Sequence, residues 1–118
     1  MTGRIYGLET EFGVLPVLES KEDIAKKVPS RGFLKNGGRY YVCVSGSHPE
    51  YATPECASVR DLVKYDKTGE AIAQGLSPKL ELYKNNLSYR GRETFGCHEN
   101  YLVHGGVFSE AKLFPIIP

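Results

Sequence analysis

The segment from Arg4 to Val14, with the sequence RIYGLETEFGV, constrains the fold more than any other part of the chain. Its side chains alternate as expected for a β-strand, in which successive residues point to opposite faces of the sheet. One face carries most of the large apolar residues, and the other carries Glu9 and Glu11 with glycines before and after them. The sequence therefore predicts a strand with one face toward the core and one face available for chemistry.

The composition is that of one globular domain. The chain has 118 residues, of which 41% are hydrophobic, and this is enough to bury a core. A formal net charge of +1 does not support binding of nucleic acid or of a membrane surface by charge. No apolar run is long enough to span a membrane, and the N-terminus has no apolar signal segment. We therefore expect a single cytoplasmic domain over residues 1–118.

The cysteines do not form a recognisable framework. There are three of them, Cys43, Cys56 and Cys97, and they lack C-x-x-C spacing. An odd number with wide spacing argues against a disulfide scaffold and against a structural zinc site. We expect free thiols.

Two helices are predicted from their capping patterns. Ser20 and Asp23 resemble a capping box and predict a short helix over residues 21–28, ended by a proline. Ser58 and Asp61 repeat the pattern before a second helix, which we expect to lie across the sheet. Its apolar residues recur at helical spacing, and they are Val59, Leu62, Val63, Ala73 and Leu76.

Further strands follow from alternating patterns. A turn at residues 36–38 leads into a strand over residues 39–46, and two more strands are predicted over residues 79–86 and 93–103. Short connections between helices and strands in this order favour an α+β fold. We expect a largely antiparallel sheet with helices on one face and the other face open.

The two glutamates of the first strand suggest a cation site. Residues two apart on a strand project the same way at a separation of roughly 7 Å. Glu9 and Glu11 are therefore placed to flank a hard cation such as Mg²⁺, which prefers oxygen ligands and retains several waters. The alternative is that both carboxylates simply lie on a solvated face.

A second group of polar residues surrounds the segment Ser45–Cys56. Two prolines fix its backbone, and Glu50 lies there between a proline and a tyrosine rather than among lysines. With Arg39 and Tyr41 upstream, this region offers a guanidinium for phosphate, oxygen ligands for a metal and the hydroxyl of Thr53. The alternative is a proline-shaped turn without chemistry.

The segment GCHENYL, residues 96–102, contains a third group. Cys97 and His98 are adjacent on a predicted strand and point to opposite faces, so they do not form a thiol–imidazole pair. Structural roles are the commoner explanation for such residues. His98, Glu99 and Asn100 receive no functional assignment from the sequence, and neither does Glu11 beyond its place beside Glu9.

Taken together, these motifs resemble the Pup ligase/depupylase family, within the glutamine-synthetase-like carboxylate-amine ligases. Six segments occur in the order typical of the family from end to end of the chain, namely GLETEFG, FLKNGGRYY, GSHPEYATPEC, YDKTGE, LYKNN and GCHENYL. The residues that make up these motifs, and the short segment between Gly13 and Phe33, favour the ligase branch over the depupylase branch.

The resemblance implies a specific chemistry. Enzymes of this kind use ATP and Mg²⁺ to phosphorylate the C-terminal glutamate side chain of the small protein Pup, and a substrate lysine then forms an isopeptide bond. Glu9, Tyr41 and Glu50 match the family's magnesium positions, and Arg39 and Thr53 match its ATP contacts. The implied partners are a Pup-like protein and lysine-bearing proteins, with neither nucleic acid nor a membrane involved.

The chain also departs from the family pattern. Cys43 stands where the family has an aspartate as general base, so no catalytic residue is matched, and one extra residue precedes His48. The family's enzymes are several times longer, so we expect part of a glutamine-synthetase-like catalytic domain, the N-terminal part, which a complementing C-terminal segment or subunit would complete. Two alternatives remain: a non-catalytic binding or regulatory homologue, and an amidohydrolase of the depupylase type.

Overall fold

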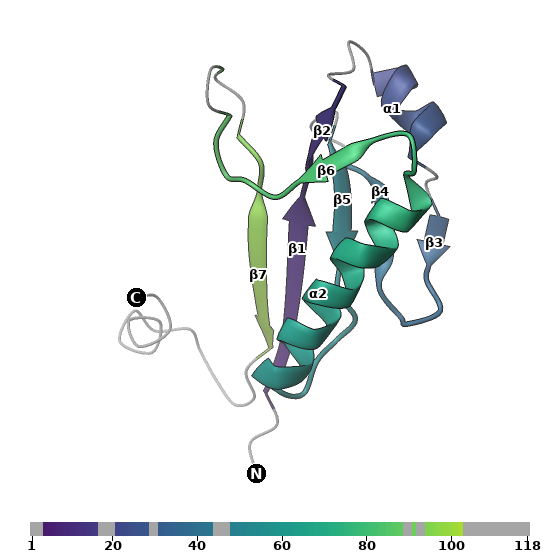
Figure 1. The fold of residues 1–118 in the computed structure, drawn as a ribbon. Coiled ribbons are helices and arrows are strands. Elements are labelled where there is room, and N and C mark those ends of the chain that lie inside the picture. The colour runs from purple at the N-terminus through teal and green to yellow at the C-terminus, as the bar shows by residue number, and fades with distance from the viewer. Residues whose placement is uncertain are drawn as a thin grey trace.

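The computed structural model describes residues 4–16, 21–28, 31–43, 48–88, 91 and 94–102 (Figure 1). Its elements along the chain are β1 (Ile5–Glu11), β2 (Gly13–Leu15), α1 (Lys21–Lys27), β3 (Arg31–Phe33), β4 (Arg39–Val42), β5 (Pro49–Ala52), α2 (Val59–Leu76), β6 (Glu81–Tyr83) and β7 (Cys97–Leu102). None of the helices in these ranges has the length and apolar character needed to cross a membrane.

The main sheet has five strands in the order β3-β4-β5-β1-β7, and β2 pairs with β6 in a separate two-stranded sheet. Every pairing is antiparallel. Helix α2 runs across one face of the main sheet (Figure 1). The predicted α+β fold with a largely antiparallel sheet is therefore confirmed, and β1 lies in the sheet between β5 and β7.

The predicted first strand is divided in two. β1 ends at Glu11, Phe12 leaves the strand and is only 3% exposed, and β2 then continues toward β6. The backbone N–H of Phe12 donates to the carbonyl of Pro49 at 2.8 Å, which fixes the break against β5. Anchoring of Phe12 in the core is thus what redirects the chain from one sheet to the other.

Two strands were not predicted. β3 is three residues long, too short for alternation to be visible. β5 begins with Pro49, and a proline argues against a strand inside a sheet. It is tolerated here because it is the first residue of the strand. Of the predicted strand over residues 39–46, the part up to Val42 is confirmed, while the part after Cys43 lies outside the described residues.

The start of α2 is as predicted. Ser58 is the N-cap, and its side-chain oxygen accepts a hydrogen bond from the backbone N–H of Asp61 at 3.1 Å. The corresponding cap of α1, Ser20, and the proline that was expected to end that helix both lie outside the described residues.

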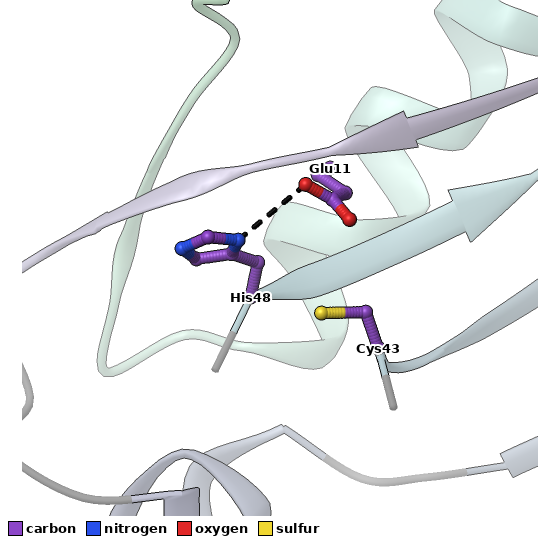
Figure 2. Close-up of side chains that lie close together, drawn as sticks. All are labelled: Glu11, Cys43 and His48. Carbon is purple, nitrogen blue, oxygen red and sulfur yellow. Dashed lines mark ion pairs between the residues drawn. The ribbon is translucent and has the colours of Figure 1, made fainter. Parts of the chain in front are cut away.

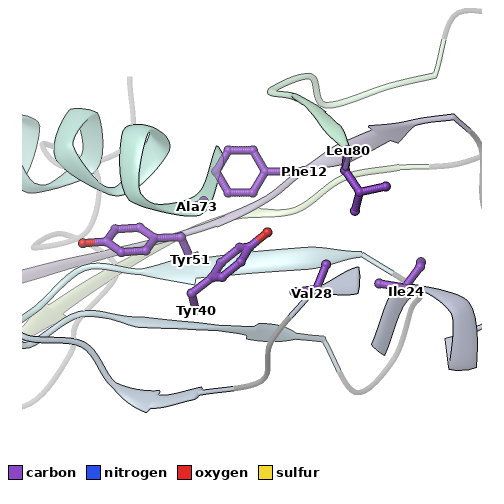
Figure 3. Close-up of a cluster of buried hydrophobic side chains, with 7 residues drawn as sticks. All are labelled: Phe12, Ile24, Val28, Tyr40, Tyr51, Ala73 and Leu80. Atoms are coloured by element: carbon purple, nitrogen blue, oxygen red, sulfur yellow. The ribbon is translucent and has the colours of Figure 1, made fainter. Parts of the chain in front are cut away.

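The prediction of which residues of α2 face the core is partly wrong. Ala73 is buried as predicted, but Val59 and Val63 are 59% and 55% exposed, and the helix also buries Asp66 and Gly69. The reason is the close approach of the helix to the sheet, which small residues permit and branched ones prevent. The core beneath it combines Phe12, Ile24, Val28, Tyr40, Tyr51, Ala73 and Leu80 (Figure 3).

Gly69 provides a sharp test of this packing. A Cβ at Gly69 would overlap the ring of Tyr51, whereas a Cβ at Gly75 of the same helix would meet no atom within 4 Å. Overpacking of a core costs roughly 1–3 kcal/mol, while glycine to alanine in an open helical position gains up to about 1 kcal/mol. We expect Gly69→Ala to lower the free energy of unfolding and Gly75→Ala to leave it unchanged or raise it. Urea denaturation measures both variants, and equal effects would contradict this packing.

Candidate functional site

The register of the strands places the polar residues of four strands on one sheet face. Directly opposite residues in antiparallel strands share a face. One row runs across the sheet through Arg39, Ala52, Glu9 and His98, and a second row runs through Tyr41, Glu50 and Glu11. Thr10 and Tyr51 are paired on the opposite face, where Tyr51 meets Gly69 of α2. The expected division of the first strand into a core face and a polar face is confirmed.

Glu9 and Glu50 converge with His98. One ligand atom from each of these three residues lies within 4.8 Å of the others. The Nδ1 of His98 is 3.4 Å from Oε2 of Glu9. Glu50 is 6% exposed, whereas the side chains of Glu9 and His98 are 35% and 62% exposed. The cluster therefore has a buried base and an open side, from which a cation or a ligand can approach.

Tyr41 is bound to this cluster through its hydroxyl. It donates a hydrogen bond to Oε1 of Glu50 at 2.9 Å. Burial raises the pKa of Tyr41, the hydrogen bond and negative charge of Glu50 and the charge of Glu9 raise it further, and Arg39 opposes them. The phenol is therefore neutral at physiological pH. Its oxygen retains lone pairs that can face a cation while its O–H donates to Glu50.

The carboxylates crowd one another. Burial raises the pKa of Glu50 above its ordinary value. The hydrogen bond from Tyr41 lowers it, the charges of Glu9 and Glu11 raise it again, and His98 lowers it. A bound divalent cation would relieve this repulsion and is held best by hard oxygen donors. The donor set at this cluster therefore fits Mg²⁺.

Arg39 lies at the other end of the first row. Its guanidinium carbon is 5.1 Å from the centroid of the Tyr41 ring and 5.7 Å from that of Phe33, so the cation rests over aromatic faces. Ala52 is the residue between Arg39 and Glu9 in the row. Its methyl group is the smallest side chain of this row.

Thr53 is hydrogen-bonded to the backbone of β1. Its Oγ1 accepts a hydrogen bond from the backbone N–H of Leu8 at 3.0 Å, and its own N–H donates to the Leu8 carbonyl at 2.8 Å. Thr53 also lines a pocket of about 280 Å³ together with Gly7 and Asn100. These two residues pair with each other one row along from Glu9, so the pocket adjoins the carboxylate cluster.

Glu11 belongs to a different group from Glu9. Its ligand oxygen lies within 4.8 Å of donor atoms of Cys43 and His48, which also lie within that distance of each other (Figure 2). Oε2 of Glu11 is 3.4 Å from Nδ1 of His48, and it accepts a hydrogen bond from the backbone N–H of Gly96 at 2.6 Å. The two neighbouring glutamates thus serve two separate clusters.

The extra residue before His48 does not disturb the sheet. Tyr41 pairs with Glu50 and Val42 with Pro49 in regular register, and the backbone N–H of Cys43 donates to the carbonyl of His48 at 2.9 Å. Glu50 therefore lies on the same sheet face as Tyr41 and Glu11.

The segment 96–102 contains three residues to which the sequence assigned no function, His98, Glu99 and Asn100. His98 pairs with Glu9, and Asn100 lines the pocket. Glu99 instead accepts a hydrogen bond from the hydroxyl of Tyr101 at the exposed strand β7. Antiparallel pairing of β7 with β1 could have placed His98 among the carboxylates, because it sets His98 directly opposite Glu9 and so on the same sheet face.

The fold and the site define an α+β protein with a carboxylate-bearing sheet face. The chain belongs to the Pup ligase family, because the family model described as Pup-ligase protein matches residues 17–117. The expected family is therefore confirmed.

Individual relatives agree. The Pup–protein ligase of Kineococcus radiotolerans is 46% identical over 134 residues, covering 89% of this chain and 29% of that protein. The Pup–protein ligase of Nocardioides sp. is 42% identical over 137 residues, covering 92% and 30%. The crystal structure of the complex between the prokaryotic ubiquitin-like protein Pup and its ligase PafA matches with a TM-score of 0.74 at 34% identity, covering 93% of this chain and 27% of that one. The chain spans less than a third of the length of these curated relatives.

Replacing Glu50 tests the crowding of carboxylates. Because the folded-state pKa of Glu50 is raised, stability falls as the pH rises from its unfolded pKa through its folded one. We expect Glu50→Gln, which still accepts the bond from Tyr41, to raise the free energy of unfolding at pH 7 without divalent cations and to change it little at pH 4. Urea denaturation in a chelator measures this. Glu81→Gln, at an exposed site on β6, is the control, and the same pH response in both variants would contradict the argument.

Proposed function

We propose that this chain supplies the magnesium- and phosphate-binding face of an ATP-dependent Pup–protein ligase. The observation that carries the proposal is the convergence of Glu9 and Glu50 within 4.8 Å at the ligand atoms, on a face that also carries Tyr41 and Arg39. Membership of the family supports a ligase function for this arrangement, since the relatives that match are named Pup–protein ligases.

Each residue has a role that its chemistry permits. Glu9 and Glu50 would hold Mg²⁺ through carboxylate oxygens, with the neutral hydroxyl of Tyr41 as a further oxygen ligand. Arg39 would bind phosphate oxygens with its fork of N–H donors. Thr53 would donate a hydrogen bond from its hydroxyl to the nucleotide, while its oxygen continues to accept one from the backbone N–H of Leu8.

ATP would supply the phosphoryl group that activates the C-terminal glutamate side chain of Pup for isopeptide bond formation with a substrate lysine, leaving ADP. The proposed partners are Pup and lysine-bearing proteins, and the proposed location is the cytoplasm. The proposal includes a complementing segment or subunit, because the chain covers less than a third of its relatives.

Cys43 favours a second candidate function. It occupies the position that the resemblance assigns to the family's general base, and a thiol is a poor replacement for an aspartate in this role. A homologue that binds ligand or partner through the same face without turnover would show this substitution. The two candidates share the binding face and differ in catalysis.

Binding of Mg-ATP tests the shared part. We expect weak binding by the chain, reduced at least tenfold in Glu9→Gln and Glu50→Gln because each removes a charged oxygen ligand. Glu81→Gln should bind as the unaltered chain does. Calorimetric titration with and without Mg²⁺ measures this, and equal binding by all variants would place the nucleotide elsewhere.

Catalysis tests the difference between the candidates. The chain is mixed with ATP, Mg²⁺, Pup, a lysine-bearing protein and the remaining segment of a related ligase, and a parallel mixture contains a preformed Pup–protein conjugate in place of free Pup. ADP release with conjugate formation supports the ligase, silence with retained binding supports the non-catalytic homologue, and cleavage of a conjugate without ADP release supports a depupylase-type enzyme.

Restoring the aspartate tests the role of position 43. A general base contributes about 10²- to 10⁴-fold to a rate, so Cys43→Asp should increase conjugation by at least an order of magnitude in the complemented mixture. Cys97→Asp, at an exposed cysteine on β7, controls for the added charge. No gain from Cys43→Asp would remove the general-base assignment from this position.

A further inference from the structure

The cluster of Glu11, Cys43 and His48 has a composition unlike that of the carboxylate cluster. It contains a thiol, an imidazole and a carboxylate, contributed by the end of β1, the residue after β4 and the residue before β5. Figure 2 shows the three side chains directed toward a common space. Glu11 is distant in sequence from Cys43 and His48, and the pairing of β1 and β4 with β5 brings the three together.

The spacing of the donor atoms suits a small cation. Ligands around a tetrahedral zinc ion, with Zn–S of about 2.3 Å and Zn–N of about 2.0 Å, lie about 3.3–3.7 Å from one another. Oε2 of Glu11 and Nδ1 of His48 are 3.4 Å apart, which is already within that range. The distances to Sγ of Cys43 are at most 4.8 Å, so a small rotation of side chains completes the arrangement.

The ligands are held in place by their surroundings. The backbone N–H of Gly96 donates to Oε2 of Glu11 at 2.6 Å. The ring of His48 packs against Phe95 with centroids 4.6 Å apart. Cys43 is 6% exposed, and its N–H bond to the His48 carbonyl links these two ligands through the backbone. Such supporting contacts orient metal ligands and strengthen binding.

The donor types select the ion. Thiolate and imidazole prefer zinc and similar ions, whereas magnesium prefers oxygen donors. A thiolate and a carboxylate together neutralise a divalent charge, which matters at side chains as protected as those of Glu11 and His48, 13% and 22% exposed. The neighbouring cluster, with two carboxylates, has the opposite preference.

We infer that Glu11, Cys43 and His48 form a three-ligand site for Zn²⁺, separate from the face that Glu9 and Glu50 offer to magnesium. Three protein ligands leave one coordination position for water or a ligand. The inference goes beyond the proposed function and does not depend on it. The prediction that the three cysteines are free of disulfides is confirmed. The argument against zinc rested on spacing along the chain, which cannot reveal ligands that strand pairing brings together.

Metal titration of the chain, reduced with a phosphine, tests the inference. Zn²⁺ is titrated against a chromophoric chelator, and Co²⁺ is used as a spectroscopic substitute, because a thiolate–cobalt charge-transfer band requires a cysteine ligand. We expect one tight zinc equivalent and the band in the unaltered chain. Cys43→Ser should abolish the band and weaken zinc binding at least tenfold, and His48→Ala should weaken zinc binding to a similar degree.

Two matched variants serve as controls. Cys97→Ser removes an exposed cysteine and should keep both the band and the affinity. Glu9→Gln alters the neighbouring cluster and should also keep them. Far-UV circular dichroism establishes that each variant is folded.

The inference is overturned if the unaltered chain shows no charge-transfer band, a result that needs no variant. It is also overturned if Cys43→Ser and Cys97→Ser bind zinc equally, or if Glu9→Gln alone removes zinc binding, which would place the ion in the carboxylate cluster. None of these results would affect Mg-ATP binding, so failure of this inference and failure of the proposed function are distinguishable.

Discussion

The antiparallel pairing of β1 with β5 on one side and β7 on the other is the constraint on which the candidate site depends. Side chains alternate between faces along every strand, so a shift of one residue in either pairing would turn a carboxylate toward the core. The burial of Phe12 and Tyr51 beneath α2 opposes such a shift, because both residues belong to the core on the other face. Packing on one side of the sheet thereby fixes the geometry of the charged groups on the other.

This constraint explains how one strand serves two chemically distinct clusters. Glu9 and Glu11 lie on the same face, yet their neighbours across the sheet differ: His98 is paired with Glu9, while His48 lies against Glu11. The first cluster is rich in oxygen donors and more open to solvent. The second contains a buried thiol and is more enclosed. The two clusters therefore lie only two residues apart along β1, although the donors of one suit a hard cation and those of the other suit a softer ion.

Local patterns predicted the parts of the structure that local physics determines. Alternation from Arg4 to Val14 gave both faces of β1, and the cap at Ser58 gave the start of α2. The face of α2 was predicted less well, because pattern analysis favours aliphatic residues and the helix approaches the sheet through Gly69. β5 was missed because its first residue is a proline.

The site was predicted in the same uneven way. The residues proposed for magnesium and phosphate came from family resemblance, and alternation supported Glu9. The places of His98 and of Glu11 depend on pairing between segments far apart in sequence, which no local window contains. Their partners became visible only with the register of the strands.

The small side chain of Ala52 has a consequence for the evolution of this surface. Ala52 lies between an arginine and a glutamate in one row across the sheet. Only a methyl group therefore stands between these opposite charges in that row. Because the core lies on the other face, a larger residue at position 52 would add its bulk on the polar face and not in the core. Under the proposed function, the size of this one side chain would therefore set how closely a phosphate bound by Arg39 approaches Glu9.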